Sequence, residues 1–244
     1  MDYALPMQTL SSLFAYHGAR RVRSVALATL CLFIGAGTAM PSPLAPEALL
    51  ERGIARFEAG QPGAAKRDLD AALAADPTLW DGYVTLLRID LAQGDWPGAG
   101  RTLRRALGAL TGPETRRQIQ ALIDALVARV QALLREHRPA EALALVREAL
   151  SSVSESKALH KLYGEALMAR GRELLAEGKT SEAIERFREA IRRTPQELAA
   201  YLDLARALFS NGRLSEALRA LRDALRIDPE NRDARDMMKG LTRV

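Results

Sequence analysis

Two short stretches of this chain have a similar composition, begin with glycine and lie 34 residues apart. Gly60–Ala65 reads GQPGAA, and Gly94–Ala99 reads GDWPGA. Each stretch separates two runs of apolar residues spaced three and four apart, which is the spacing of amphipathic helices. A glycine suits a tight turn between two helices, because it adopts backbone conformations that other residues avoid. The pattern therefore predicts helix–turn–helix units that recur along the chain.

The recurrence extends to three kinds of position: a glycine at the turn, alanines in the second helix, and a proline after the second helix. The glycines are Gly60, Gly94, Gly178 and Gly212. The alanines are Ala65, Ala72, Ala99, Ala106, Ala142, Ala149, Ala183, Ala190, Ala217 and Ala224. The prolines are Pro77, Pro195 and Pro229. Proline cannot continue a helix, so each one marks the end of a unit.

This set of positions resembles the tetratricopeptide repeat (TPR) family, whose period is 34 residues. The stretch Asn211–Asn231, which reads NGRLSEALRALRDALRIDPEN, is close to the family consensus. The resemblance covers residues 46–231 and implies an all-α solenoid of about five helix–turn–helix repeats with a C-terminal capping helix. Each repeat needs neighbours, because a single helix pair cannot bury its own apolar stripe.

The expected organisation assigns repeats to three regions. They are residues 46–112 for repeats 1 and 2, residues 113–154 for a degenerate repeat, and residues 155–231 for repeats 4 and 5. Residues 232–244 are expected to form the capping helix. In the degenerate repeat, His137-Arg138-Pro139 replaces the turn glycine. The intervals Ala99–Ala142 and Ala142–Ala183 are 43 and 41 residues. The sequence therefore predicts first helices in 113–136 and 155–177 that are about two turns longer than usual. Whether they kink or divide the array stays open.

The N-terminal residues 1–39 are expected to be a signal peptide or a membrane anchor, followed by a linker in residues 40–45. Arg20–Arg23 precede 16 uncharged residues, 24–39, which end in small residues, as a secretory signal does. Cleavage predicts export to the periplasm. An uncleaved segment predicts an inner-membrane anchor facing the periplasm, with membrane contact only through residues 24–39. The single cysteine, Cys31, lies in this segment and excludes an internal disulfide framework.

The composition argues against a catalytic function and against a nucleic-acid partner. The net charge is +5, but 35 basic and 30 acidic residues are interspersed, as on a solvated helical surface. Outside the N-terminal segment the chain has no cysteine and two histidines, His137 and His160, so neither a metal site nor a cofactor is expected. No glycine-rich loop follows a predicted strand, so no phosphate-binding loop is expected either.

The TPR resemblance implies a concave groove, lined by the first helix of each repeat, that holds a protein or peptide partner. One groove position in each repeat is apolar, and these residues are Leu50, Val84, Val127, Met168 and Leu202. The position four residues later is occupied by Ile54, Arg88, Gln131, Arg172 and Arg206. The three arginines could bind a partner carboxylate. Alternatively, they pair with Asp81, Glu165 and Asp203 nearby.

Two further expectations concern neighbouring positions. The repeat position three residues after this second groove position is expected to lie in the core. It is occupied by Phe57, Leu91, Leu134, Leu175 and Phe209. The carboxylate-clamp subgroup of the family needs Lys and Asn where this chain has Leu50, Ile54 and Thr85, so recognition of chaperone tails is not expected. Trp96 is expected in the core, while Trp80 could be buried or a partly exposed anchor for a partner.

These observations predict a non-catalytic adaptor of the bacterial cell envelope, which binds a partner polypeptide in the groove and supports assembly of an envelope or secretion complex. The alternative is an inner-membrane-anchored scaffold whose repeats mediate self-assembly, so a homo-oligomer remains open.

Overall fold

The computed structural model describes residues 44–241, and the expected signal or anchor segment lies outside them. Within these residues the chain forms eleven α-helices and no strand, which confirms the all-α expectation. None of the helices in this part of the chain is long and apolar enough to cross a membrane.

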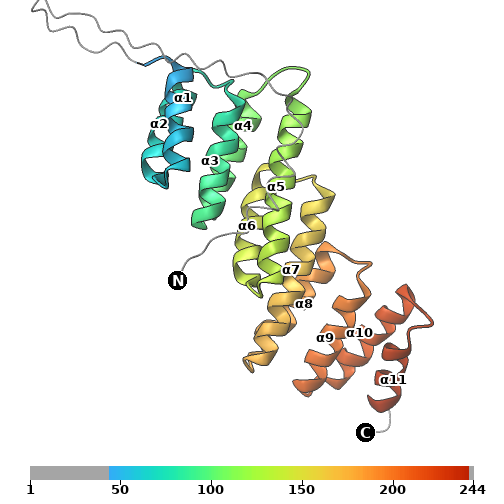
Figure 1. Cartoon of the computed structure of the whole chain (residues 1–244). Coiled ribbons are helices and arrows are strands. Elements are labelled where there is room, and N and C mark those ends of the chain that lie inside the picture. The colour runs from blue at the N-terminus through green and yellow to red at the C-terminus, as the bar shows by residue number, and fades with distance from the viewer. Residues whose placement is uncertain (1–43, 242–244) are drawn as a thin grey trace, which may run out of the picture. The chain divides into compact units, whose positions relative to one another are not determined.

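The helices form successive antiparallel pairs, which Figure 1 labels in chain order. They are α1 (Pro46–Glu58), α2 (Pro62–Ala75), α3 (Trp80–Gln93), α4 (Trp96–Ala109), α5 (Thr115–Arg135), α6 (Pro139–Ser152), α7 (Lys157–Ala176), α8 (Thr180–Arg193), α9 (Leu198–Ser210), α10 (Leu214–Ile227) and α11 (Arg232–Leu241). The second helices α2, α8 and α10 end two residues before Pro77, Pro195 and Pro229, respectively.

The described chain divides into two units between Gly82 and Tyr83, in the first turn of α3. The division is therefore not at the long helices α5 and α7. In the first unit, α1 packs on α2. Gly53 on α1 permits this approach, because a Cβ atom there would lie 2.8 Å from Cγ of the fully buried Leu69.

In the second unit, α5, α7 and α9 form a row of first helices, since α5 contacts α7 and α7 contacts α9. Second helices pack beside them: α6 contacts α5 and α7, α8 contacts α7 and α9, and α10 contacts α9. The helix α11 packs on α10. Trp96 lies in the core of this unit, as expected.

All ten alanines at the repeat positions are fully buried, in both units. A larger side chain at such a position would push two helices apart, because protein interiors are close-packed. Gly171 on α7 plays a similar role. A Cβ atom there would lie 2.5 Å from Cε1 of the buried Phe187 on α8.

His137 takes the role of the turn glycine in the degenerate repeat. Its φ is 56°, in the left-handed region, and φ of Gly178 at the equivalent turn is 76°. The backbone bonds match as well: Arg138 N donates to Leu133 O at 2.9 Å, and Lys179 N donates to Leu174 O at 2.8 Å. The turn geometry is therefore kept without glycine, at the expense of backbone strain on a side-chain-bearing residue.

The helices α5 and α7 have 21 and 20 residues, whereas α1, α3 and α9 have 13 or 14. They occupy the regions where the intervals between repeat alanines predict long first helices. Since α9 begins at Leu198 and the repeat is 34 residues, the equivalent start in α7 is Gly164. Residues 157–163 therefore form an N-terminal extension of α7 that α9 does not have.

Candidate protein-binding surface

The candidate surface lies on the row of first helices α5, α7 and α9 in the second unit. It contains the groove residues expected on these helices, which are Val127, Gln131, Met168, Arg172, Leu202 and Arg206. Val84 and Arg88 lie half-buried on α3. Leu50 and Ile54 lie half-buried on α1, in the first unit.

The apolar positions on this surface are less accessible than a peptide-binding stripe would require. Met168 and Leu202 are only 6% and 8% exposed, and Val127 is half-buried. Their helices contact one another in the row, so neighbouring first helices cover much of these side chains. Apolar contact with a partner is therefore restricted on α7 and α9.

Arg172 and Arg206 converge on one carboxylate. Arg172 Nε donates to Asp203 Oδ2 at 2.7 Å, and a nitrogen of the Arg206 guanidinium donates to Asp203 Oδ1 at 3.2 Å. The expected pairing of Arg206 with Asp203 is thus present. Arg172 pairs with Asp203 on the next first helix rather than with Glu165 on its own helix. Glu165 lies 3.9 Å from Lys161 instead.

The charge distribution of this cluster leaves it able to bind an anion. The Asp203 side chain is 8% exposed, whereas those of Arg172 and Arg206 are 56% and 52% exposed. One carboxylate neutralises one of the two positive charges. A guanidinium carries five N–H donors, so each arginine keeps donors for a partner carboxylate after bonding Asp203.

The expectation that Phe209 lies in the core is wrong. This residue is 48% exposed at the C-terminal end of α9. At the equivalent positions Leu91 is buried, whereas Phe57, Leu134 and Leu175 are half-buried. The following helix α11 packs on α10, and Phe209 stays accessible. The repeat pattern does not predict this exposure, because it describes the position of a residue within its repeat and not the helices that pack around it. The sequence signal for its exposure is the position of Phe209 in the last repeat, because no further repeat follows to cover it.

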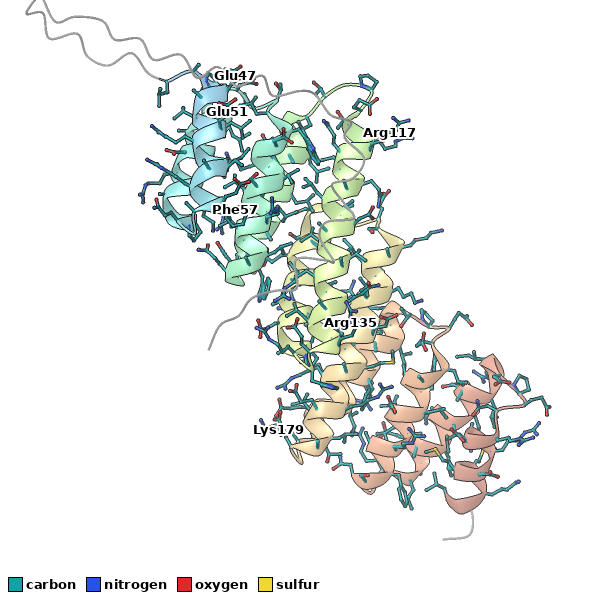
Figure 2. All side chains as sticks on the ribbon, in the orientation of Figure 1. Glu47, Glu51, Phe57, Arg117, Arg135 and Lys179 are labelled. Carbon is teal, nitrogen blue, oxygen red and sulfur yellow. The ribbon has the colours of Figure 1, made fainter. Side chains whose placement is uncertain are left out.

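Gln131 and Arg135 add polar groups at the C-terminal part of α5. Both side chains are exposed, and Arg135 is labelled in Figure 2. Arg135 Nε donates to Gln131 O at 3.3 Å, which holds its side chain along the helix. The accessible chemistry of the candidate surface is therefore mainly cationic and polar, with Phe209 as its large exposed apolar side chain.

A second carboxylate held by two arginines lies in the first unit and was not anticipated. Asp68 on α2 accepts two hydrogen bonds of 2.8 Å from Arg52 and one of 2.7 Å from Arg56, both on α1. The hydrogen bonds from Arg52 lower the pKa of Asp68 against the opposing effect of burial. This cluster connects the two helices of one repeat. Its sequence signal is a pair of arginines four residues apart on the first helix and an aspartate on the second.

The described residues show no cluster of three or more His, Cys, Asp or Glu side chains that could hold a metal ion.

Two segments match sequence profiles of the tetratricopeptide repeat family, residues 127–173 and residues 174–241. Residues 127–241 of this chain are tetratricopeptide repeats. Together the two matched segments extend from the C-terminal half of α5 to the end of α11. No curated protein sequence matches this TPR chain.

Several solved structures of TPR proteins are similar to this chain. YrrB, described as a TPR protein with an unusual peptide-binding site, is 17% identical with a TM-score of 0.35, over 78% of this chain and 90% of YrrB. A thermophilic TPR protein in Thermus thermophilus is 20% identical with a TM-score of 0.32, over 82% and 100%. PilW, a type IV pilus biogenesis factor, is 17% identical with a TM-score of 0.38, over 81% and 84%. The family assignment rests on the two profile matches, and membership supports a role as a protein–protein interaction adaptor.

Proposed function

We propose that this TPR protein is a non-catalytic adaptor that binds an acidic or C-terminal carboxylate of a partner polypeptide on α7 and α9. The observation that carries the proposal is the pair of exposed arginines, Arg172 and Arg206, held on the buried carboxylate of Asp203. An arginine whose position is already fixed loses less side-chain entropy when it binds a ligand. Asp203 therefore prepares both guanidinium groups for a partner.

Phe209 supplies the apolar part of the same contact. It lies three residues after Arg206 on α9, and residues three apart share a helix face. Aromatic side chains that become buried on binding contribute strongly to interface affinity. A partner segment with an apolar side chain close to a carboxylate would satisfy both features.

We place this activity in the bacterial cell envelope, where the protein would support assembly of an envelope or secretion complex. The support is the basic patch Arg20–Arg23 followed by the uncharged residues 24–39. N-terminal sequencing of the expressed protein with cell fractionation tests this location. A soluble chain that starts near Met40 supports periplasmic export. A full-length chain in the membrane fraction supports the anchored alternative, and a soluble full-length chain contradicts both.

Capture of partners from envelope extract tests the binding surface. The full chain with Arg172→Gln and Arg206→Gln should capture less of the proteins that the wild type retains. The matched control carries Arg219→Gln and Arg222→Gln, which alter two exposed arginines on α10. Equal capture by the wild type and the R172Q/R206Q variant would remove Arg172 and Arg206 from the proposed interface.

A further inference from the structure

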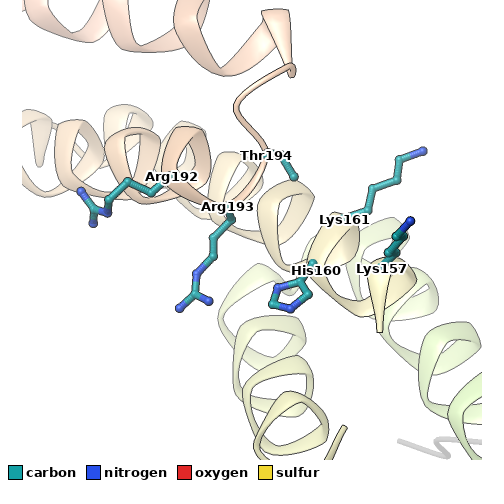
Figure 3. A pocket seen from close by; sticks show the side chains of 6 residues that line it. All are labelled: Lys157, His160, Lys161, Arg192, Arg193 and Thr194. Carbon is teal, nitrogen blue, oxygen red and sulfur yellow. The ribbon is translucent and has the colours of Figure 1, made fainter. Parts of the chain in front are cut away.

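A basic cavity of about 470 Å³ opens between the N-terminal end of α7 and the C-terminal end of α8 (Figure 3). Its lining residues are Lys157, His160, Lys161, Arg192, Arg193 and Thr194. Four of the six are cations, and none is a carboxylate. Such a lining attracts anions, because like charges gathered at one site raise its positive potential.

The cavity exists because α7 is longer than a standard first helix. All three of its α7 residues, Lys157, His160 and Lys161, lie in the N-terminal extension 157–163. The repeat that follows has no such extension on α9. Lys161 lies seven residues before Met168, which corresponds to about 10 Å along the helix axis. The cavity is therefore separate from the candidate surface on α7 and α9.

Helix stability does not account for the cations on α7. The N-terminus of a helix carries partial positive charge, so acidic side chains are favourable in the first turn and basic ones are not. Lys157 and Lys161 stand in the first two turns of α7, against this preference. Arg192 and Arg193, by contrast, lie favourably in the last turn of α8. The α7 lysines thus add positive charge where folding alone would disfavour it.

The cations are poorly neutralised by the rest of the described chain. Lys157 and Arg192 form no ion pair with any residue in 44–241, and Lys161 lies 3.9 Å from Glu165. The nearby carboxylate of Glu189 is already engaged. It accepts hydrogen bonds from the Tyr163 hydroxyl at 2.9 Å and from Arg186 at 3.0 Å.

Several contacts hold the lining in place. The Arg193 guanidinium lies over the Tyr163 ring, 5.1 Å from its centroid. His160 Nε2 donates to Ser154 O at 2.6 Å. Gly164 lets Thr194 approach α7, because a Cβ atom at Gly164 would lie 2.8 Å from Thr194 Oγ1. The site is therefore partly organised before any ligand arrives.

We propose that this cavity binds an acidic polypeptide segment, with several carboxylates spread over the four cations. Figure 3 shows the cationic side chains pointing in different directions around the cavity rather than toward one point. A single phosphate is better bound by amides that converge at a helix N-terminus. Here two of these amides are already used, since Ser156 N donates to Val153 O and Leu159 N donates to Ser156 Oγ. Carboxylates spaced along an acidic polypeptide match the four separated cations of the cavity better than a single phosphate does.

The test is fluorescence anisotropy of a labelled decaglutamate peptide with the full-length chain in detergent. The variant Lys157→Glu/Arg192→Glu should weaken binding about tenfold or more, because two attractive contacts become repulsive. The control Arg219→Glu/Arg222→Glu makes the same change of net charge on α10 and should bind within about twofold of the wild type. The milder variant Lys157→Gln/Arg192→Gln should give an intermediate loss. Circular dichroism melting of each variant checks that the helices are intact.

Three outcomes overturn the proposal: no binding of decaglutamate, an equal loss in the R219E/R222E control, or unchanged binding by both pocket variants. Competition identifies the anion. Inorganic phosphate or vesicles containing phosphatidylglycerol that displace the peptide at lower concentrations than unlabelled decaglutamate would also overturn it, in favour of a phosphate ligand. The pocket variants change neither Arg172 nor Arg206, so the adaptor proposal is tested separately by the R172Q/R206Q variant.

Discussion

Arg172 on α7 bonds across the repeat boundary to Asp203 on α9, with 2.7 Å between Nε and Oδ2. The bond connects the first helices of two successive repeats through a carboxylate that is almost completely buried. Arg206 binds the other oxygen of the same carboxylate. The cluster therefore has two possible uses in one place: it stabilises the boundary between repeats, and it orients two exposed guanidinium groups.

Removal of both arginines should destabilise the protein by more than the sum of the single changes. Arg172→Ala or Arg206→Ala alone leaves Asp203 one cation, so each should lower the free energy of unfolding by less than about 1 kcal/mol. The double variant leaves a buried carboxylate without either partner and should lower it by about 2–3 kcal/mol. Urea denaturation of the four proteins measures the coupling. Additive effects would show that solvent reaches Asp203 freely.

His137→Gly should stabilise the degenerate repeat. A left-handed conformation disfavours residues with a Cβ atom by about 1–2 kcal/mol, and the extra freedom of glycine in the unfolded chain offsets part of the gain. We expect a net increase of about 0.5–1 kcal/mol in the free energy of unfolding. The reverse change, Gly178→Ala at φ 76°, should lower it by about 1 kcal/mol. If both variants melt like the wild type, left-handed strain does not limit stability at these turns.

The local architecture could be predicted from sequence because it depends on spacing along the chain. The alanines, the turns and the long helices α5 and α7 all follow from the 34-residue interval and its two interruptions. A helical periodicity is set by neighbours three and four residues apart, which the sequence displays directly. His137 could be recognised as a replacement for glycine by the same alignment. Its left-handed φ required the structure.

Interactions between helices could be predicted only in part. The sequence offers Asp203 as a partner for Arg206, three residues away, but does not indicate its bond to Arg172, which is 31 residues away. The apolar residues at equivalent positions predict that Phe209 lies in the core, but its exposure depends on which helix α11 covers. The cavity near Lys157 also arises from two helix ends that are distant in the sequence. Such features depend on tertiary packing, which periodicity does not encode.

Gly171→Ala should destabilise the hairpin of α7 and α8. Alanine normally favours a helix over glycine by about 1 kcal/mol. Here its Cβ would lie 2.5 Å from the buried ring of Phe187, and overpacking of this kind typically costs about 1–3 kcal/mol. We expect a net loss of about 1–2 kcal/mol. Gly108→Ala on α4 is the matched control, because nothing lies within 4 Å of its Cβ position, and it should be neutral or stabilising. A stable G171A variant would show that Phe187 can move.

The Asp68 cluster should make the stability of the first unit depend on acid pH. Its pKa is lowered in the folded state, chiefly by hydrogen bonds from Arg52. Between the lowered pKa and the unfolded value of about 4, the unfolded chain binds more protons, so stability rises with pH there. The contribution is complete above about pH 4 and is lost as pH falls through the folded pKa.

Asp68→Asn removes this ionisable group but keeps the size of the side chain. At neutral pH the D68N variant should melt at a lower temperature than the wild type, because Arg52 and Arg56 lose a charged acceptor. The difference should shrink as pH falls below about 4, since protonation of Asp68 then removes the same charge from the wild type. Asp76→Asn is the control for a carboxylate whose pKa is also lowered, but by Thr78 on the same short segment, without any contact between helices. Thermal melting across this range, followed by circular dichroism, would contradict the assignment if the gap between D68N and the wild type stayed constant at every pH.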